Sequence, residues 1–238
     1  MTRAIVTGGT RGIGYAIARA ILAGGGRVAI TGRETEAVTA AVTALSSSAA
    51  LPTNVSGAAV DVRDRLAVEE FVAEAVSRLG GLDVLVNNAG VGVFVDVASM
   101  SDADWDRTID TNLTGVFYST RAALPAMKKS GGGWIINIAS LAGRNYFPRG
   151  AAYCASKAGL IAFSESLMQE VRYDHIRVSV IMPGSVATDF GGSPASPDEM
   201  AWKLSPDDVA EVVADLLRHP TRSLPSKIEM RPSEPKKA

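Results

Sequence analysis

Short runs rich in Val, Ile and Leu alternate with longer amphipathic stretches along almost the whole chain. Runs in which apolar residues follow one another without alternation are typical of strands that are covered on both faces. Seven such runs are bounded by turn residues and are predicted to be strands. They are Ala4–Thr7, Arg27–Thr31, Ala58–Val60, Leu82–Asn87, Trp134–Ala139, Ile176–Met182 and Lys227–Arg231.

The stretches between these runs repeat apolar residues at the period of a helix that packs on one face. The first of them shows Ile13, Ile17 and Ile21 and stops at three consecutive glycines. The longest is expected to kink near Pro125, and the last begins with Ser205 as N-cap and a proline in its first turn. The further helices are predicted at Glu34–Leu45, Arg65–Leu79, Asp102–Lys129, Ala152–Arg172 and Pro206–Arg218.

Alternating strands and helices predict a single-domain α/β protein on a doubly wound parallel sheet of the Rossmann type, with about seven strands and helices on both faces. Ligands of such sheets bind outside the carboxyl ends of the strands. We expect this domain to span residues 1–231 and residues 232–238 to form a flexible tail. Two segments rich in small or turn-forming residues, Ser46–Gly57 and Gly191–Asp198, are predicted to be surface loops.

The composition narrows the class of function. Of the 238 residues 47% are hydrophobic and 21% are charged, and the net charge is −1, so bulk electrostatics favour neither nucleic acid nor an anionic membrane as a partner. No run approaches the ~20 apolar residues of a membrane-spanning helix, and no signal peptide is evident, so a cytoplasmic enzyme is expected. The single cysteine, Cys154, and two histidines form no metal-site pattern, and no metal is predicted.

A glycine-rich turn joins the first predicted strand to the first helix. It contains Gly8, Gly12 and Gly14, in the spacing Gly-xxx-Gly-x-Gly. Glycines let the backbone approach a phosphate closely, and the N-terminus of the following helix attracts negative charge. The turn therefore predicts a site for a dinucleotide pyrophosphate, although its spacing differs from the Gly-x-Gly-x-x-Gly fingerprint.

Tyr153 and Lys157 stand four residues apart at the start of a predicted helix. Four residues are about one turn, so the phenol and the ammonium share one face. A cation beside a phenol favours the phenolate and lowers a pKa that is otherwise about 10, which predicts a tyrosine general acid/base. A carbonyl that accepts hydride also needs a hydrogen-bond donor at its oxygen, and Ser140 after the fifth strand is the candidate.

The glycine turn, the run Asn87–Gly90, Ser140 and the Tyr153–Lys157 pair together resemble the short-chain dehydrogenase/reductase family over essentially the whole chain. The resemblance implies an oxidoreductase that transfers hydride between a nicotinamide cofactor and a carbonyl or secondary alcohol, with Tyr153 as acid/base. Lys157 would hold the nicotinamide ribose and lower the tyrosine pKa, and Ser140 would bind the substrate oxygen. Asn112 matches the family's asparagine, which helps to hold a water in the proton relay.

The resemblance also implies that the cofactor lies along the carboxyl ends of the strands. Asp61 and Val62 would receive the adenine, the backbone at Val186 the carboxamide, and Thr188 would lie near the phosphates. The full set of expected cofactor-binding residues is Gly8, Thr10, Arg11, Gly12, Ile13, Gly14, Arg33, Asp61, Val62, Asn88, Ala89, Gly90, Tyr153, Lys157, Pro183, Gly184, Val186 and Thr188.

The end of the second strand favours NADP(H) over NAD(H). An acid there would bind the adenosine ribose hydroxyl and repel a 2′-phosphate, but the chain has Gly32 at that position. Arg33 follows it and Arg11 lies in the glycine turn, and two guanidinium groups suit a phosphate. Glu34 stands at the spacing of a ribose-binding acid but is interpreted as a first-turn helix residue.

The expected substrate is a small hydrophobic carbonyl or alcohol compound, because the candidate wall residues are mostly apolar. They are Val91, Phe94, Leu141, Tyr146 and Phe190. The adjacent Arg144 and Arg149 are expected to be exposed. The resemblance further implies a homodimer or homotetramer that pairs the long helices near Asp102–Lys129 and Ala152–Arg172.

Two alternatives stay open. The chain also resembles 3-oxoacyl-ACP reductases, although it ends its last strand with Ile228–Pro232 instead of a glycine-rich segment and shows no basic cluster for an acidic carrier protein. A non-catalytic NADP(H)-binding redox sensor on the same fold is the alternative from another class. The intact set of Asn112, Ser140, Tyr153 and Lys157 speaks against it.

Overall fold

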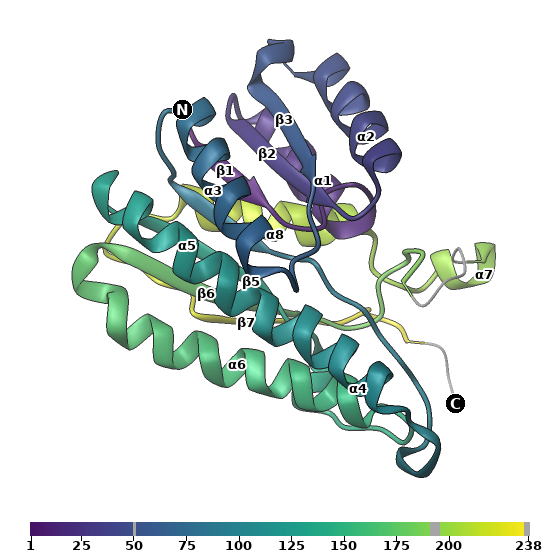
Figure 1. Ribbon diagram of the computed structural model, residues 1–238. Coiled ribbons are helices and arrows are strands. Elements are labelled where there is room, and N and C mark those ends of the chain that lie inside the picture. Colours follow the sequence, from purple (N-terminus) through teal and green to yellow (C-terminus); the bar gives the residue numbers. More distant parts are fainter. Residues whose placement is uncertain (50, 191–195, 236–238) are drawn as a thin grey trace.

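The computed structural model describes residues 1–49, 51–190 and 196–235 and contains one parallel sheet of seven strands (Figure 1). The strand order is β3-β2-β1-β4-β5-β6-β7, so the direction of winding reverses between β1 and β4. Doubly wound sheets bind ligands beside such a reversal, at the carboxyl ends of the strands, and we refer to this region as the crevice. The strands are β1 (Arg3–Val6), β2 (Arg27–Gly32), β3 (Val55–Ala59), β4 (Val84–Asn87), β5 (Gly133–Ile138), β6 (Ile176–Pro183) and β7 (Lys227–Met230).

Helices cover both faces of the sheet (Figure 1). Because alternate residues of a strand point to opposite faces, Ala4 and Val6 of β1 pack under α1, α2 and α8, whereas Ile5 packs under α3, α5 and α6. The helices are α1 (Gly12–Ala23), α2 (Thr35–Ser48), α3 (Arg65–Leu79), α4 (Asp102–Ile109), α5 (Gly115–Lys129), α6 (Ala151–Val171), α7 (Pro197–Met200) and α8 (Pro206–Arg218). None of the described helices is long and apolar enough to cross a membrane.

The fold class predicted from the sequence is confirmed, and the corrections concern boundaries. The long helix predicted at Asp102–Lys129 is interrupted at Asp110–Thr114 by a π-helical turn, whereas Pro125 lies inside α5. The predicted loop Ser46–Gly57 is shorter than expected, because α2 runs to Ser48 and β3 already begins at Val55. Ser and Ala give weak signals for where a helix or strand ends, so the ends of α2 and β3 are decided by packing on the sheet and could not be read from the sequence.

Two other predicted segments fall partly outside the described residues. Of the loop Gly191–Asp198, residues 191–195 are outside them, and Pro197–Met200 forms the short helix α7 with Ser196 as its N-cap. Of the tail, residues 236–238 are outside them, and residues 231–235 belong to no helix or strand. The last predicted strand accordingly ends at Met230, one residue earlier than expected.

A ladder of buried polar side chains ties the sheet to its helices close to the carboxyl ends of β4 and β5. Asn87 of β4 donates from Nδ2 to Oδ1 of Asn137 on β5 at 2.8 Å, and Asn137 donates to Ser164 of α6 at 2.8 Å. On the same face of the sheet, Ser119 of α5 donates to Asn87 Oδ1 at 2.7 Å. A neighbouring partner on α5, Thr120, accepts from Asn87 Nδ2 at 3.2 Å. These hydrogen bonds therefore fix α5 to β4 and α6 to β5.

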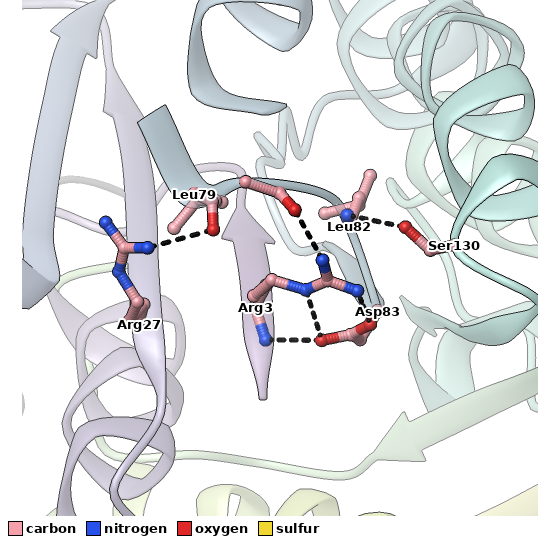
Figure 2. A network of polar contacts seen from close by, with 7 residues as sticks. Arg3, Arg27, Leu79, Leu82, Asp83 and Ser130 are labelled. Carbon is pink, nitrogen blue, oxygen red and sulfur yellow. Dashed lines mark hydrogen bonds and ion pairs between the residues drawn. The ribbon is translucent and has the colours of Figure 1, made fainter. Parts of the chain in front are cut away.

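The amino ends of the strands are held by a separate network, shown in Figure 2. Arg3 of β1 donates from its backbone N and from Nε to Asp83 Oδ2, both at 2.9 Å, and from Nη2 to Oδ1 at 2.5 Å. Burial alone would raise the pKa of Asp83, but the hydrogen bonds from Arg3 outweigh it and lower that pKa. Arg27 and Ser130 extend the network to the ends of α3 and β4. The amino ends of β1, β2 and β4 are thus fixed by the Arg3–Asp83 ion pair and by hydrogen bonds from neighbouring segments.

We predict that Asn137→Ala destabilises the protein by about 2–4 kcal/mol, because it leaves the amide of Asn87 and the hydroxyl of Ser164 with one partner fewer in a buried setting. Urea unfolding measures the change. The exposed Asn145→Ala is the control and should change the free energy of unfolding by less than about 0.5 kcal/mol. Equal stability of the two variants would contradict the role given to the ladder.

Candidate active site

Four of the expected residues meet at the carboxyl ends of β4 and β5. Ser140 follows β5 and accepts a hydrogen bond from Ala142 N at 3.1 Å, which starts a 3-10 turn at Leu141–Gly143. This turn leads to α6, whose first turns carry Tyr153 and Lys157. The fourth residue, Asn112, comes from the π-helical turn between α4 and α5.

Lys157 is a buried ammonium at the end of a strand. Only 4% of the residue is exposed, and its Nζ donates to the carbonyl oxygen of Ile138 at 2.9 Å. Ile138 is the last residue of β5 and lies beyond the final β4–β5 pair, so the lysine completes the hydrogen bonding of this strand end. Burial lowers the pKa of Lys157 to about 8.

The phenol of Tyr153 lies beside this ammonium, with Lys157 Nζ 5.8 Å from the ring centroid. Burial raises the pKa of Tyr153, and a hydrogen bond from the Ser140 hydroxyl opposes that shift without cancelling it. The net direction is the reverse of the lowering expected from the Tyr153–Lys157 spacing, because desolvation of the phenolate outweighs the favourable contacts. The tyrosine is therefore a protonated hydrogen-bond donor near neutral pH in this structure.

Asn112 is completely buried and braces two neighbouring segments. Its Oδ1 accepts from Val91 N at 2.9 Å, and its Nδ2 donates to Val91 O at 2.9 Å and to Ser156 Oγ at 3.0 Å. A Cβ built on Gly90 would lie 3.3 Å from Asn112 Oδ1 and 3.6 Å from Lys157 Nζ. Asn112 and Lys157 thus flank the same small residue, which places them on one side of the crevice.

The glycine turn and the segment after β4 form one hydrogen-bonded unit. Asn88 donates from Nδ2 to the carbonyls of Thr7 and Gly8, both at 3.0 Å, and Thr7 Oγ1 accepts from the backbone N of Asn88 and Ala89. Gly8 has φ +64°, and a Cβ on Gly14 would lie 2.3 Å from Gly8 O. Only glycines can form so tight a turn, which the half-buried side chain of Asn88 holds in place.

This turn ends at the amino end of α1, where the backbone N–H groups carry no side-chain cap and no acidic residue lies in the first turn. Thr188, from the segment after β6, reaches the turn: a Cβ on Gly12 would lie 3.3 Å from Thr188 Cγ2. Ile13 instead packs against the hydrophobic core and anchors the helix start. The donors left at this position fit an anion such as a pyrophosphate.

At the ends of β2 and β3 the structure explains the missing acid. A Cβ on Gly32 would lie 2.4 Å from Thr10 Cγ2, so a side chain there would have to displace that of Thr10. Asp61 accepts from Arg63 at its backbone N and its guanidinium, and this pairing lowers the pKa of Asp61, with Arg33 adding a smaller favourable charge. Sequence reasoning did not single out Arg63, which occupies the carboxylate that was expected to receive the adenine.

The remaining expected cofactor residues are distributed around this crevice. Arg11 lies 3.6 Å from Asp189, which places it beside the segment after β6, whereas Arg33 lies near Asp61. Glu34 is the N-cap residue of α2 and makes no capping hydrogen bond. Val62 is buried against Gly115 at the start of α5.

The segment Pro183–Thr188 continues from β6 and is held by backbone contacts. Gly184 N donates to Met230 O at 2.8 Å, and Val186 forms a parallel bridge with Leu204. These contacts turn the chain back over the crevice after β6. Thr188 is thereby brought to the glycine turn of the first helix.

Only some of the residues expected to form the substrate wall lie against Tyr153. Phe94 and Phe190 both lie against the ring of Tyr153, whereas Tyr146 is 71% exposed. Phe147, which the sequence reasoning missed, contacts Phe94 with ring centroids 5.9 Å apart. The other two wall candidates are Val91, bound to Asn112, and Leu141, which is buried.

Other features lie away from these residues. A hollow of about 410 Å³ at the amino ends of the strands is lined by Arg3, Asp83, Trp134 and Arg177, on the side of the sheet opposite the crevice. No group of three or more possible metal ligands occurs among the described residues. Cys154 is buried, as expected for a packed residue.

Comparisons with known proteins agree with this geometry. A family model described as short chain dehydrogenase matches residues 2–198. NADP-dependent 3-hydroxy acid dehydrogenase YdfG of Salmonella typhi is 37% identical over 238 residues, covering 96% of this chain and 94% of that protein. 3-Oxoacyl-[acyl-carrier-protein] reductase FabG of Chlamydia muridarum is 40% identical over 187 residues, covering 79% and 75%.

A further relative is much longer than this chain. Glycine betaine reductase ATRR of Emericella nidulans is 34% identical over 239 residues, but the chain spans 97% of its own length and only 19% of that protein. Among solved structures, an alcohol dehydrogenase from Thermococcus sibiricus complexed with 5-hydroxy-NADP is similar with a TM-score of 0.92 and 30% identity, over 100% of this chain and 99% of that one.

We predict a specific pH dependence of stability from Lys157. Its pKa is about 8 in the folded protein and about 10.5 when exposed, so between these values the unfolded state binds more protons and stability rises with pH. Relative to Lys157→Met, the free energy of unfolding of the native protein should increase by about 2 kcal/mol between about pH 7 and about pH 9.5.

Urea unfolding at several pH values measures this difference. The matched control is Lys129→Met, an exposed lysine at the end of α5, which should follow the pH profile of the native protein. Parallel profiles for the native protein and Lys157→Met would show that the buried ammonium does not have a lowered pKa.

Proposed function

The chain belongs to the short-chain dehydrogenase family, and from that premise we propose that it reduces a carbonyl compound with NADPH, or oxidises the secondary alcohol in reverse. The observation that carries this proposal is the convergence of Ser140, Tyr153 and Lys157 at the carboxyl ends of β4 and β5. A proton donor, a second hydrogen-bond donor and a buried cation within one crevice are what carbonyl reduction requires.

The proposed chemistry uses each of these groups once. When bound, the nicotinamide supplies the hydride for reduction and accepts it for oxidation. As the carbonyl carbon gains the hydride, negative charge develops on its oxygen, and Ser140 donates a hydrogen bond to it. Tyr153 transfers its proton to that oxygen, which yields the alcohol and leaves a phenolate beside the ammonium of Lys157. The phenol of Tyr153 is protonated when reduction begins, and because burial raises its pKa and makes it a weaker acid, proton transfer depends on the stabilisation of the phenolate by nearby groups.

Lys157 and Asn112 would support the tyrosine. We propose that Lys157 holds the nicotinamide ribose hydroxyls and that its charge stabilises the phenolate after proton transfer. Asn112 is proposed to help hold a water molecule through which protons pass between Lys157 and solvent. Its side chain is bound to Val91 and Ser156, so its immediate effect is to position the segment after β4 against α6.

The cofactor would lie from the glycine turn to the segment after β6. The residues proposed to hold it are those named from the sequence, with Gly8, Gly12 and Gly14 at the pyrophosphate. Preference for NADP(H) is supported by Arg33 at the end of β2, by the closed space at Gly32, and by relatives and solved structures whose names specify NADP. We further propose a homodimer or homotetramer on the family resemblance, and a cytoplasmic setting.

A 3-oxoacyl-ACP reductase is the second candidate, supported by the similarity to FabG. The surface beside the crevice offers it little, because Glu229 pairs with both Arg144 and Arg231, and one net positive charge is left on these three side chains. An acidic carrier protein would need such cations to be free. We therefore favour a free small-molecule substrate.

We predict that Tyr153→Phe lowers kcat/KM by at least about 100-fold while NADPH binding and the fold are retained, because the ring remains and only the transferred proton is lost. NADPH consumption with a panel of ketones, aldehydes and quinones measures turnover, and fluorescence titration measures binding. A native protein that binds NADPH tightly but turns over no member of the panel would favour the redox sensor instead.

We also predict a strong preference for NADPH over NADH in kcat/KM. Arg33→Ala should lower kcat/KM for NADPH by about 10- to 100-fold and leave that for NADH nearly unchanged, because it removes a charged hydrogen-bond donor for the 2′-phosphate. Arg78→Ala, an exposed arginine at the far end of α3, is the control. Equal efficiency of the native protein with both cofactors would refute the preference.

A further inference from the structure

Three phenylalanine rings gather on the proposed acid from three different segments. Phe94 follows β4, Phe147 precedes α6 and Phe190 follows β6, so all three segments leave the same edge of the sheet (Figure 1). Phe94 meets the ring of Tyr153 edge-on, with centroids 5.5 Å apart and planes at 70°. Phe190 lies 5.7 Å from Tyr153, and Phe147 extends the cluster behind Phe94 at 5.9 Å.

These rings present a large apolar surface to solvent. Phe94, Phe147 and Phe190 are 38%, 43% and 45% exposed, although each ring contacts at least one other ring of the cluster. Isolated exposed apolar residues are ordinary, but a contiguous aromatic group around a reactive phenol marks a surface that an apolar ligand can cover. The cluster is therefore a partly exposed apolar surface beside Tyr153 that an apolar ligand would complete.

The backbone around the rings is adapted to their approach. A Cβ on Gly92 would lie 2.7 Å from both Phe94 Cζ and Phe190 Cε1, so only glycine lets the two rings converge there. Arg149 donates from Nη2 to Phe94 O at 3.1 Å and has φ +66°, a backbone conformation that non-glycine residues rarely adopt. The carbonyl of Phe94 is thereby held by a residue at the start of α6.

The charges around the cluster do not favour an anionic substrate. Arg144 is paired with Glu229, and Arg149 is engaged with the carbonyl of Phe94. Asp189, next to Phe190, is a carboxylate and lies 3.6 Å from Arg11. Arg144 and Asp189 each lie in an ion pair and Arg149 binds a backbone carbonyl, so each of these groups already has a partner and the uncharged rings suit a neutral ligand.

We propose that the site takes neutral aryl carbonyl compounds, or the corresponding benzylic alcohols, with the aryl ring against Phe94 and Phe190 and the carbonyl oxygen at Tyr153 and Ser140. This inference rests on the proposed function and names its substrate class. Aromatic rings prefer edge-to-face and offset contacts with other rings, and a saturated ring of similar size gains only the burial of its surface. The reaction itself is unchanged, with hydride to the carbonyl carbon and the Tyr153 proton to its oxygen.

The test compares acetophenone with cyclohexyl methyl ketone, which carry the same methyl ketone on an aromatic and a saturated six-membered ring. The quantity is the ratio of kcat/KM for the two ketones at saturating NADPH, measured in the native protein and in single variants. Phe94→Leu and Phe190→Leu should each lower the aryl/cyclohexyl ratio by roughly five- to tenfold, because they keep apolar bulk but remove the ring contacts.

Tyr173→Leu is the control, because Tyr173 is 88% exposed in the turn before β6, at the opposite edge of the sheet, and it should keep the native ratio. Thermal unfolding verifies that each variant is folded. An unchanged ratio in both folded phenylalanine variants overturns the proposed aryl site. Turnover of other carbonyls but of no aryl ketone overturns it too and leaves the proposed function intact, whereas the absence of turnover with any carbonyl refutes both.

Discussion

The buried ammonium of Lys157 is the constraint on which the carboxyl end of the sheet depends. A cation removed from water is costly unless it finds a hydrogen-bond acceptor, and here the carbonyl of Ile138 provides one. That contact joins the end of β5 to the second turn of α6. Gly143 has to be small because a Cβ there would lie 2.7 Å from Ile161 Cδ1 and 2.8 Å from the backbone of Lys157. The turn after β5 therefore packs directly on α6 at the position of Lys157.

The polar ladder beneath the site has the same effect on a larger scale. Asn87 and Asn137 are neighbours on adjacent strands, and each passes a hydrogen bond to a helix on one face of the sheet. Among the described residues, no buried side-chain nitrogen or oxygen lacks a partner. A fully satisfied network of this kind tolerates few alternative arrangements, so α5 and α6 are held in one register relative to the strands. Because Tyr153 lies in the first turn of α6, its position depends on this fixed register.

The sequence predicted the fold class and the order of elements because strand and helix periods are local properties, and the spacing of Tyr153 and Lys157 needs only one helical turn. It could not predict the π-helical turn at Asp110–Thr114, in which the side chain of Asn112 binds Val91 and Ser156 of other segments. The direction of the Tyr153 pKa was wrong for a similar reason, since burial is decided by segments that meet only in the folded chain. The roles of the site residues stay predictions.

The lack of space at Gly32 constrains how this protein could change over evolutionary time. A carboxylate introduced there meets Thr10, which belongs to the glycine turn of another segment, so the two positions are coupled. A Cβ at position 32 would also lie 3.0 Å from Val38 Cγ2, in α2. A side chain at this position is therefore accommodated only together with a shift or a substitution at positions 10 and 38.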